Sequence, residues 1–248
     1  MADAVTATRD DRGIWIVAIE DRVGRNTFTV AVVSGLFAAF GRVADDPAAK
    51  AVVVHGFDTI FLAGGTVEEL IGIAERRQRF DEAGFYRLLL DCPVPVISAM
   101  QGHALGGGLV FGLYADIIVM AREALFSANF MKYGFSPGMG STMILPEKLG
   151  TALGEEMLLT AQSYHGGQLA ARGVSAQVLP RTEVIPAAIA TANELADKPA
   201  EALRLLKAHL TAERRAKLPS VVEQEVAMHD VTFQTPGVKD RIRDRWGA

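Results

Sequence analysis

Cysteine is almost absent from this sequence: Cys92 is the only one among 248 residues. A single thiol cannot form a disulfide within the chain, so a packed core must hold the fold together. The opening residues MADAVTATRDDRG also lack the basic and then apolar pattern of a secretory signal peptide. From these two absences we expect a cytoplasmic protein.

The sequence also lacks an excess of positive charge. Its 25 lysines and arginines are outnumbered by 29 acidic residues, which gives a net charge of −4 and argues against nucleic acid as a partner. The longest apolar run, residues 105–120, contains Asp116 and several glycines, so we expect no membrane span. The cysteine and histidines do not have the spacing of metal ligands, and we expect no bound metal.

Hydrophobic residues make up 50% of the chain, which is enough for a large core. Residues 4–10 and 14–21 flank the polar turn DDRG and predict a β-hairpin, and a helix is expected near 28–43. Further along, the buried strands expected at 51–57 and 93–102 alternate with helical segments. Strands that alternate with helices predict an α/β fold.

The second half of the sequence has a different pattern. From Ser141 onward it indicates helix almost throughout, with breaks at Gly150, Gly166-Gly167, Pro180 and Pro199. We therefore expect a core domain over residues 1–180 and a helical region over residues 181–248.

Two turns rich in glycine, FLAGG at 61–65 and ALGGG at 104–108, each lie between a predicted strand and a predicted helix. Thr66 and Glu69 form a capping-box pattern just after the first turn. The first N–H groups of a helix have no partner within the helix, so two such turns side by side could hold one negatively charged oxygen, as an oxyanion hole does. Two other interpretations are open: tight corners between packed elements, or a dinucleotide-binding loop. The second lacks the full G-x-G-x-x-G motif, and Asp116 comes too early for the acid that binds ribose.

Several motifs in order resemble the enoyl-CoA hydratase/isomerase (crotonase) superfamily: FLAGGTVEEL, PVPVISAMQGHALGGGLVFGLYADIIVMA, FSPGMGSTMILPEKLG and ARGVSAQVLP. The resemblance covers nearly the whole chain. It implies a fold of ββα spiral repeats and a homotrimer or hexamer assembled through the C-terminal helices. It also implies a thioester carbonyl held by the backbone amides of Gly65 and Gly107.

The chain departs from the hydratases of that family at two positions. Hydratases carry glutamates where this sequence has Val110 and, by the match of ALFSANFMKYG, Phe130. Acid–base hydration needs a titratable group near the water, and neither side chain is one. An oxyanion hole in an apolar pocket favours decarboxylation instead, because the substrate carboxylate is poorly solvated there while the anion left by CO₂ is stabilised.

The segments NFMKYGFSPGMG and EQEVAMHDVTFQTP are similar to the decarboxylating branch of the family that acts in polyketide β-branching. That resemblance implies a 3-methylglutaconyl-type thioester carried on the phosphopantetheine of an acyl carrier protein, or on CoA, with no other cofactor. It also implies a catalytic role for His229. By spacing alone, His229 shares an apolar helical stripe with Val222, Val226 and Phe233, which fits a core or trimer-contact histidine equally well.

Related decarboxylases carry a lysine after the first oxyanion turn, and its best match here is Arg77. An arginine could anchor the substrate carboxylate but is a poor proton donor. The alternative is that Arg76, Arg77 and Arg79 form a solvated loop. Ala63, Val110 and the aromatic residues Tyr86, Phe130 and Tyr133 are the expected walls of the acyl pocket, although aromatic residues at these spacings also fit plain core.

The remaining polar candidates have simpler explanations. His103 is expected to pack or bind backbone, and Asp116 to cap or pair. Lys132, Arg204 and Lys207 could meet an acidic carrier protein, but surface charge explains them as well. Two other functions stay open beside decarboxylation: a hydratase or isomerase with a different acid–base group, and a non-catalytic scaffold that binds acyl carrier protein.

Overall fold

The computed structural model describes residues 3–77 and 84–245, and it begins with the predicted hairpin. Strands β1 (Val5–Arg9) and β2 (Ile14–Ile19) pair antiparallel around the DDRG turn. Helix α1 (Val30–Ala44) follows, and its start is fixed by Thr29, whose hydroxyl accepts a hydrogen bond from the Val32 N–H at 3.2 Å. The predicted hairpin and first helix are therefore confirmed.

Three ββα units follow one another along the chain. They are β3 (Ala51–His55), β4 (Ile60–Leu62) and α2 (Val67–Ala74); β5 (Val96–Met100), β6 (His103–Leu105) and α4 (Gly107–Leu113); and β7 (Ile117–Ala121), β8 (Leu125–Ser127) and α5 (Phe130–Tyr133). The first strand of each unit joins a six-stranded sheet in the order β1-β2-β3-β5-β7-β10, and the second joins a four-stranded sheet in the order β4-β6-β8-β9. This alternation between two sheets is the predicted spiral, and the α/β class is confirmed.

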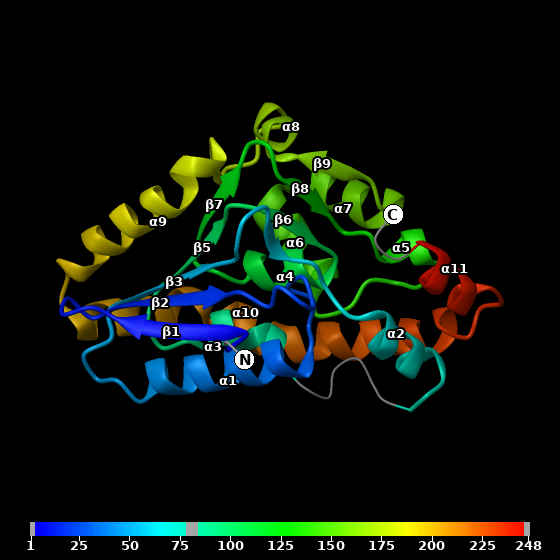
Figure 1. The fold of residues 1–248 in the computed structure, drawn as a ribbon, viewed down its shortest axis with the longest axis horizontal. Coiled ribbons are helices and arrows are strands. Elements are labelled where there is room, and N and C mark those ends of the chain that lie inside the picture. Colours follow the sequence, from blue (N-terminus) through cyan, green and yellow to red (C-terminus); the bar gives the residue numbers. More distant parts are fainter. Residues whose placement is uncertain (1–2, 78–83, 246–248) are drawn as a thin grey trace.

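Helices cover both faces of the larger sheet (Figure 1). Helix α9 (Arg181–Ala196) packs on β3, β5 and β7, while α1 lies on the other side of the hairpin. A sheet covered on both faces needs strands that are apolar throughout, which explains the run Val52, Val53 and Val54, all fully buried.

The short elements between the units and the C-terminal region complete the fold. They are the 3₁₀ turn η1 (Phe85–Arg87), α3 (Leu88–Asp91), α6 (Ser141–Leu149), α7 (Thr151–Thr160), β9 (Ser163–His165), α8 (Gly166–Ala171) and β10 (Gln177–Leu179). Strands β9 and β10 fall in the part of the sequence that was expected to be helical. Each has three residues, too few for an alternating pattern to stand out between helices.

The C-terminal region is helical as predicted, with α9, α10 (Ala200–Thr232) and α11 (Val238–Arg245). Because α9 packs on the larger sheet, this region is continuous with the core rather than set apart from it. The boundary at residue 180 stays a prediction. Among residues 3–77 and 84–245, no helix has the length and apolar character that crossing a bilayer requires.

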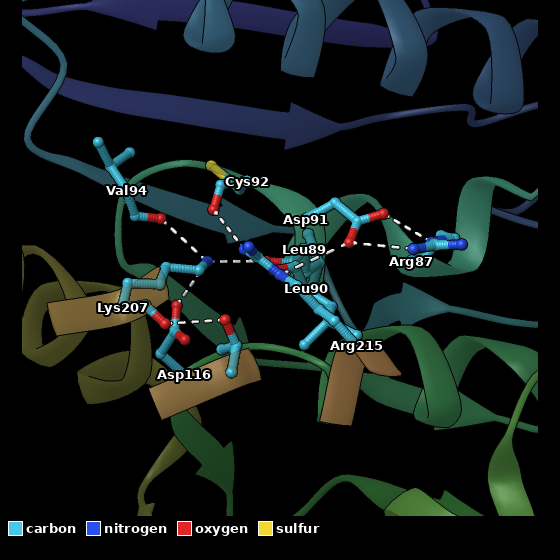
Figure 2. Close-up of polar contacts among 10 residues, drawn as sticks. Arg87, Leu89, Leu90, Asp91, Cys92, Val94, Asp116, Lys207 and Arg215 are labelled. Atoms are coloured by element: carbon cyan, nitrogen blue, oxygen red, sulfur yellow. Dashed lines mark hydrogen bonds and ion pairs between the residues drawn. The ribbon is translucent and has the colours of Figure 1, made fainter. Parts of the chain in front are cut away.

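Cations of α10 attach that helix to the end of α3 (Figure 2). The Lys207 ammonium donates to the carbonyls of Leu89 and Val94 at 2.9 and 3.0 Å and pairs with Asp116 at 2.8 Å. Asp116 also accepts from the Val96 N–H, so its expected pairing role is confirmed. The surface-charge explanation of Lys207 is wrong: its side chain is 2% exposed, because backbone carbonyls left free at the end of α3 require donors.

Candidate active site

The two glycine turns predicted from the sequence lie against each other. Strands β4 and β6, which lead into them, are parallel neighbours in the smaller sheet. A Cβ atom on Gly64 would lie 2.9 Å from the Leu105 carbonyl oxygen and 3.4 Å from the Gly107 nitrogen. A Cβ on Gly108 would lie 2.2 Å from the Leu62 oxygen. Glycine is therefore required here by close backbone approach as well as by the φ of +82° at Gly64.

Each turn ends at the first residues of a helix. Thr66 and Glu69 form the predicted capping box, in which the threonine hydroxyl accepts from the Glu69 N–H and the glutamate accepts from the Thr66 N–H. Helix α4 begins directly at Gly107. Within the described part of the chain, no acceptor bonds the N–H of Gly65 or of Gly107. Both amides are thus available to a ligand, as an oxyanion hole requires.

A cavity of about 540 Å³ lies beside these turns. Its lining includes Ala63 and Thr66 from the first turn, Leu105 from the second, and Asn129 and Tyr133 from α5 and the residue before it. At its open end it meets Val23, whose side chain is 98% exposed, and the neighbouring Arg25. The cavity therefore leads from solvent to the glycine turns, and it contains two of the predicted pocket residues, Ala63 and Tyr133.

His229 lies in an aromatic cluster connected to this cavity. Tyr133 stacks on Phe135 with ring centroids 5.9 Å apart, and Phe135 stacks on Phe233 at 4.4 Å. The imidazole of His229 stands nearly perpendicular to the Phe233 ring, at 88° and 5.3 Å. Its Nε2 is 2.8 Å from the carbonyl oxygen of Ser136, and the side chain is 4% exposed. The apolar stripe predicted for His229 is present, and Phe135 connects it to Tyr133, which lines the cavity.

The two positions where hydratases carry glutamate are buried and apolar. Val110 is fully buried in α4, and Phe130 is 4% exposed with its ring centroid 6.2 Å from that of Phe135. Tyr86 is also buried, and its ring contacts Phe85 and Tyr114 rather than the cavity described above. Burial raises the pKa of Tyr133, so this phenol stays protonated at neutral pH.

A family model for enoyl-CoA hydratase/isomerase matches residues 9–244. The chain belongs to this family. It is 48% identical over 231 residues, which is 93% of each chain, to the bacillaene synthase decarboxylase PksI of Bacillus subtilis (strain 168).

Solved structures give the same result. A chain from a dehydratase/decarboxylase enzyme couple involved in polyketide β-branching matches with a TM-score of 0.97 at 46% identity, covering 99% of this chain and all of that one. The ECH2 decarboxylase domain of CurF from Lyngbya majuscula matches with a TM-score of 0.94 at 37% identity, covering 98% of this chain and all of that domain. The predicted resemblance to the decarboxylating branch of the family is confirmed.

Arg77, like Tyr86, is a predicted site residue that does not line this cavity. Its side chain is 57% exposed and its Nε donates to Glu75 at 3.0 Å, with Lys239 on the other side of that carboxylate. This placement corresponds to the solvated alternative, because a surface ion pair satisfies the guanidinium where it lies. Arg79 lies outside the described residues.

Two asparagines that the sequence analysis did not single out shape the site. Asn26 is fully buried with φ of 51°, and its side-chain amide donates to the carbonyls of Ile19 and Phe61, while its backbone carbonyl accepts from the Ala63 N–H. It thereby fixes the first glycine turn. Asn129 lines the cavity and donates to the Tyr133 oxygen at 3.4 Å. Their sequence signal is weak, since asparagine is common in ordinary turns.

His103 has the backbone-binding role that was expected. Its Nδ1 accepts from the Leu125 N–H at 2.9 Å, and burial, together with the nearby Arg181, lowers its pKa. The imidazole is thus held neutral as an acceptor for the smaller sheet. Searched over residues 3–77 and 84–245, the structure has no group of three or more His, Cys, Asp or Glu side chains placed to hold a metal ion.

Proposed function

We propose that this protein decarboxylates a 3-methylglutaconyl-type thioester carried on the phosphopantetheine of an acyl carrier protein, in polyketide β-branching. One observation carries the proposal: two glycine turns with available amides lie together, and the positions of the hydratase glutamates are Val110 and Phe130. The names of the relatives at 48% and 46% identity support it. No other cofactor is required, and we place the protein in the cytoplasm.

The proposed reaction begins with the thioester oxygen accepting hydrogen bonds from the N–H groups of Gly65 and Gly107. The bond between the carboxylate carbon and the acyl chain then breaks, CO₂ leaves, and the electron pair enters a dienolate whose charge is largely on that oxygen. Two N–H donors fixed at helix starts stabilise this charge without reorganisation. A proton from His229 closes the reaction and gives a methylcrotonyl-type thioester. Delivery to the γ carbon gives the 3-methylcrotonyl product, and delivery to the α carbon gives the β,γ-unsaturated isomer.

The apolar walls support this chemistry in two ways. A substrate carboxylate beside Tyr133, which lines the cavity, loses solvation, which favours its departure as neutral CO₂. No carboxylate stands at the hydratase positions to activate water, so the acyl group is protected from hydration. Arg77 as an anchor of the substrate carboxylate would require its Glu75 ion pair to open.

The test is to incubate the protein with 3-methylglutaconyl acyl carrier protein and to follow the acyl mass by mass spectrometry. We expect loss of CO₂. Wild-type protein that binds the substrate with no change of mass would instead indicate the non-catalytic scaffold. Water addition to crotonyl-CoA, followed by absorbance, would indicate the hydratase.

The His229→Ala variant tests the proposed proton donor. We expect turnover to fall about 100-fold, within the range usual for loss of a general acid. The midpoint of unfolding should change little. Since Thr211 is buried in the same helix and its hydroxyl donates to the Lys207 carbonyl, Thr211→Val is the control for disturbing α10. Equal activity of His229→Ala and wild type would remove His229 from the reaction.

We also propose a homotrimer, or a hexamer of two trimers, assembled through the C-terminal helices. Helix α10 leaves large apolar side chains exposed, among them Leu205, Leu206 and Leu210 at 63, 56 and 67%. A soluble protein rarely leaves such a group uncovered on one helix.

A further inference from the structure

The hydroxyl of Thr232 and the peptide unit of Ser136 form a hydrogen-bonded clamp next to His229. The Ser136 N–H donates to Thr232 Oγ1 at 3.1 Å, and the two hydroxyl oxygens are 3.1 Å apart. Thr232 Oγ1 itself donates to the Met228 carbonyl at 3.0 Å. The single proton of the Thr232 hydroxyl goes to Met228, so Ser136 must donate both of its hydrogen bonds to Thr232 Oγ1, one from its N–H and one from its hydroxyl. Thr232 Oγ1, on α10, therefore holds Ser136 through both its backbone N–H and its hydroxyl.

The carbonyl of the same Ser136 residue determines the state of the imidazole. His229 Nε2 is 2.8 Å from this oxygen, and a carbonyl oxygen only accepts hydrogen bonds. Nε2 must therefore carry a proton, and when the ring is neutral Nδ1 is the basic nitrogen. The rings of Phe135 and Phe233 also limit rotation of the imidazole, since both stand nearly perpendicular to it.

We propose that Thr232 is a positioning residue, which acts through Ser136 to fix the tautomer and orientation of His229. This inference rests on the proposed function in one respect, the use of His229 as the proton donor. With Nε2 committed to the Ser136 carbonyl, Nδ1 is the atom that gives up the proton and regains it. Loss of the Thr232 oxygen removes the acceptor for two donors of Ser136, and the carbonyl then no longer holds the ring in one state.

The Thr232→Val variant tests this. It keeps the shape of the side chain and removes the oxygen, and Thr232→Ser restores the oxygen. The matched control is Thr211→Val, because Thr211 also lies in α10 and donates to the carbonyl four residues earlier, at 2.8 Å, without contacting Ser136. We expect kcat on 3-methylglutaconyl acyl carrier protein to fall about tenfold in Thr232→Val, with KM unchanged, and to recover in Thr232→Ser. Thr211→Val should keep the wild-type kcat.

A second measurement reads the tautomer directly in the ligand-free protein. In ¹⁵N-histidine-labelled protein above the pKa of the ring, the His229 signals, assigned with His229→Gln, should show a protonated Nε2 and an unprotonated Nδ1. Thr232→Val should show a mixture of tautomers.

Two outcomes would show that the inference is wrong. The spectrum of Thr232→Val could match that of the wild type, or Thr211→Val could lose as much kcat as Thr232→Val. If Thr232→Val does not fold, Ser136→Ala removes one of the two donors and should give the same changes at smaller size. Wild-type protein without decarboxylase activity would overturn the proposed function alone, because the tautomer is measured without substrate.

Discussion

Single glycines at the two turns determine how closely the sheets and helices of the site can approach. Gly108 lies where β4 passes α4, and a Cβ there would be 2.2 Å from the Leu62 oxygen and 2.6 Å from its carbonyl carbon. Backbone atoms cannot turn aside as a flexible side chain can, so β4 would have to move. Gly41 in α1 is a contrasting case, since a Cβ there would meet no atom within 4 Å.

We therefore expect opposite effects from two identical substitutions. Gly108→Ala should lower the free energy of unfolding by at least about 3 kcal/mol, the upper part of the range for overpacking. Gly41→Ala should raise it by about 0.5–1 kcal/mol, because alanine has the better helix propensity and a less flexible unfolded chain. Urea denaturation followed by circular dichroism measures both values. Equal stability of Gly108→Ala and wild type would mean that the close approach to β4 is not rigid.

The site residues differ in how far the sequence could identify them. The meeting of the turns at Gly65 and Gly107 was predictable because glycine runs between strand and helix have few explanations, and the order of motifs favours one of them; their role as an oxyanion hole stays a prediction. The exposure of Arg77 was not predictable, because whether an arginine faces the cavity or solvent depends on the path of the chain around it. Asn26 left only a weak signal, because an asparagine whose side-chain amide binds backbone carbonyls looks in the sequence like any turn asparagine. Ser136 left no signal, since it holds His229 through a backbone carbonyl that any residue has.

At the scale of elements, α10 is held by cations in its first half as well as by the apolar stripe of its second half. Lys207 satisfies two carbonyls and Asp116, and Arg215 donates to the carbonyl of Leu90 at 2.7 Å (Figure 2). The sequence shows these residues only as charges in a polar helix. The burial of Lys207 could not be predicted because it depends on carbonyls that become free where α3 ends, more than 110 residues earlier in the chain.

Removing the buried cation should therefore be costly. We expect Lys207→Met to lower the free energy of unfolding by about 3 kcal/mol, since it leaves Asp116 and two carbonyls without their donor. The control is Lys198→Met, which changes an exposed lysine just before the same helix and should change stability by less than about 0.5 kcal/mol. Chemical denaturation of both variants measures the difference. A loss for Lys207→Met no larger than that for Lys198→Met would contradict the structural role assigned to the buried ammonium.

The junction of α7, β9 and α8 depends on pH through Glu156. Hydrogen bonds from Arg172 and then Tyr164 lower the pKa of this carboxyl from about 4.5 to about 2. Because the folded pKa is below the unfolded one, the stabilisation is complete above pH 4.5 and is lost as the pH falls toward 2. A ¹³C NMR titration of the Glu156 carboxyl should give a midpoint near 2. In Arg172→Gln the midpoint should rise toward 4.5, and a midpoint unchanged by that substitution would show that Arg172 is not the cause.

For the whole molecule, the sequence predicted the architecture better than the surface. The first two ββα units were predictable because each combines short apolar strands, a glycine turn and a helix, whereas the third has Ala128 and Asn129 where the others have glycines. The face of α10 that we propose for subunit assembly has no comparable motif: it is visible only once the folded chain shows which side of α10 packs on the core. Leu206 and Leu210, four residues apart, lie on the side left open. Leu210 also lines a second cavity of about 410 Å³ between α10 and α6, together with Met143 and Pro146 of α6.

This open face leads to a prediction about assembly. If α10 forms the contact between subunits, the double variant Leu206→Asp, Leu210→Asp places two charges in an apolar interface and should convert the trimer into monomers. Size-exclusion chromatography with light scattering distinguishes the two states, because one chain has a mass of 26.6 kDa. The control is Leu159→Asp, since Leu159 is 77% exposed on α7 and should leave assembly unchanged. Wild-type protein that elutes as a monomer would end the trimer proposal. A double variant that remains trimeric would place the contact elsewhere and leave the exposed leucines of α10 to a different partner.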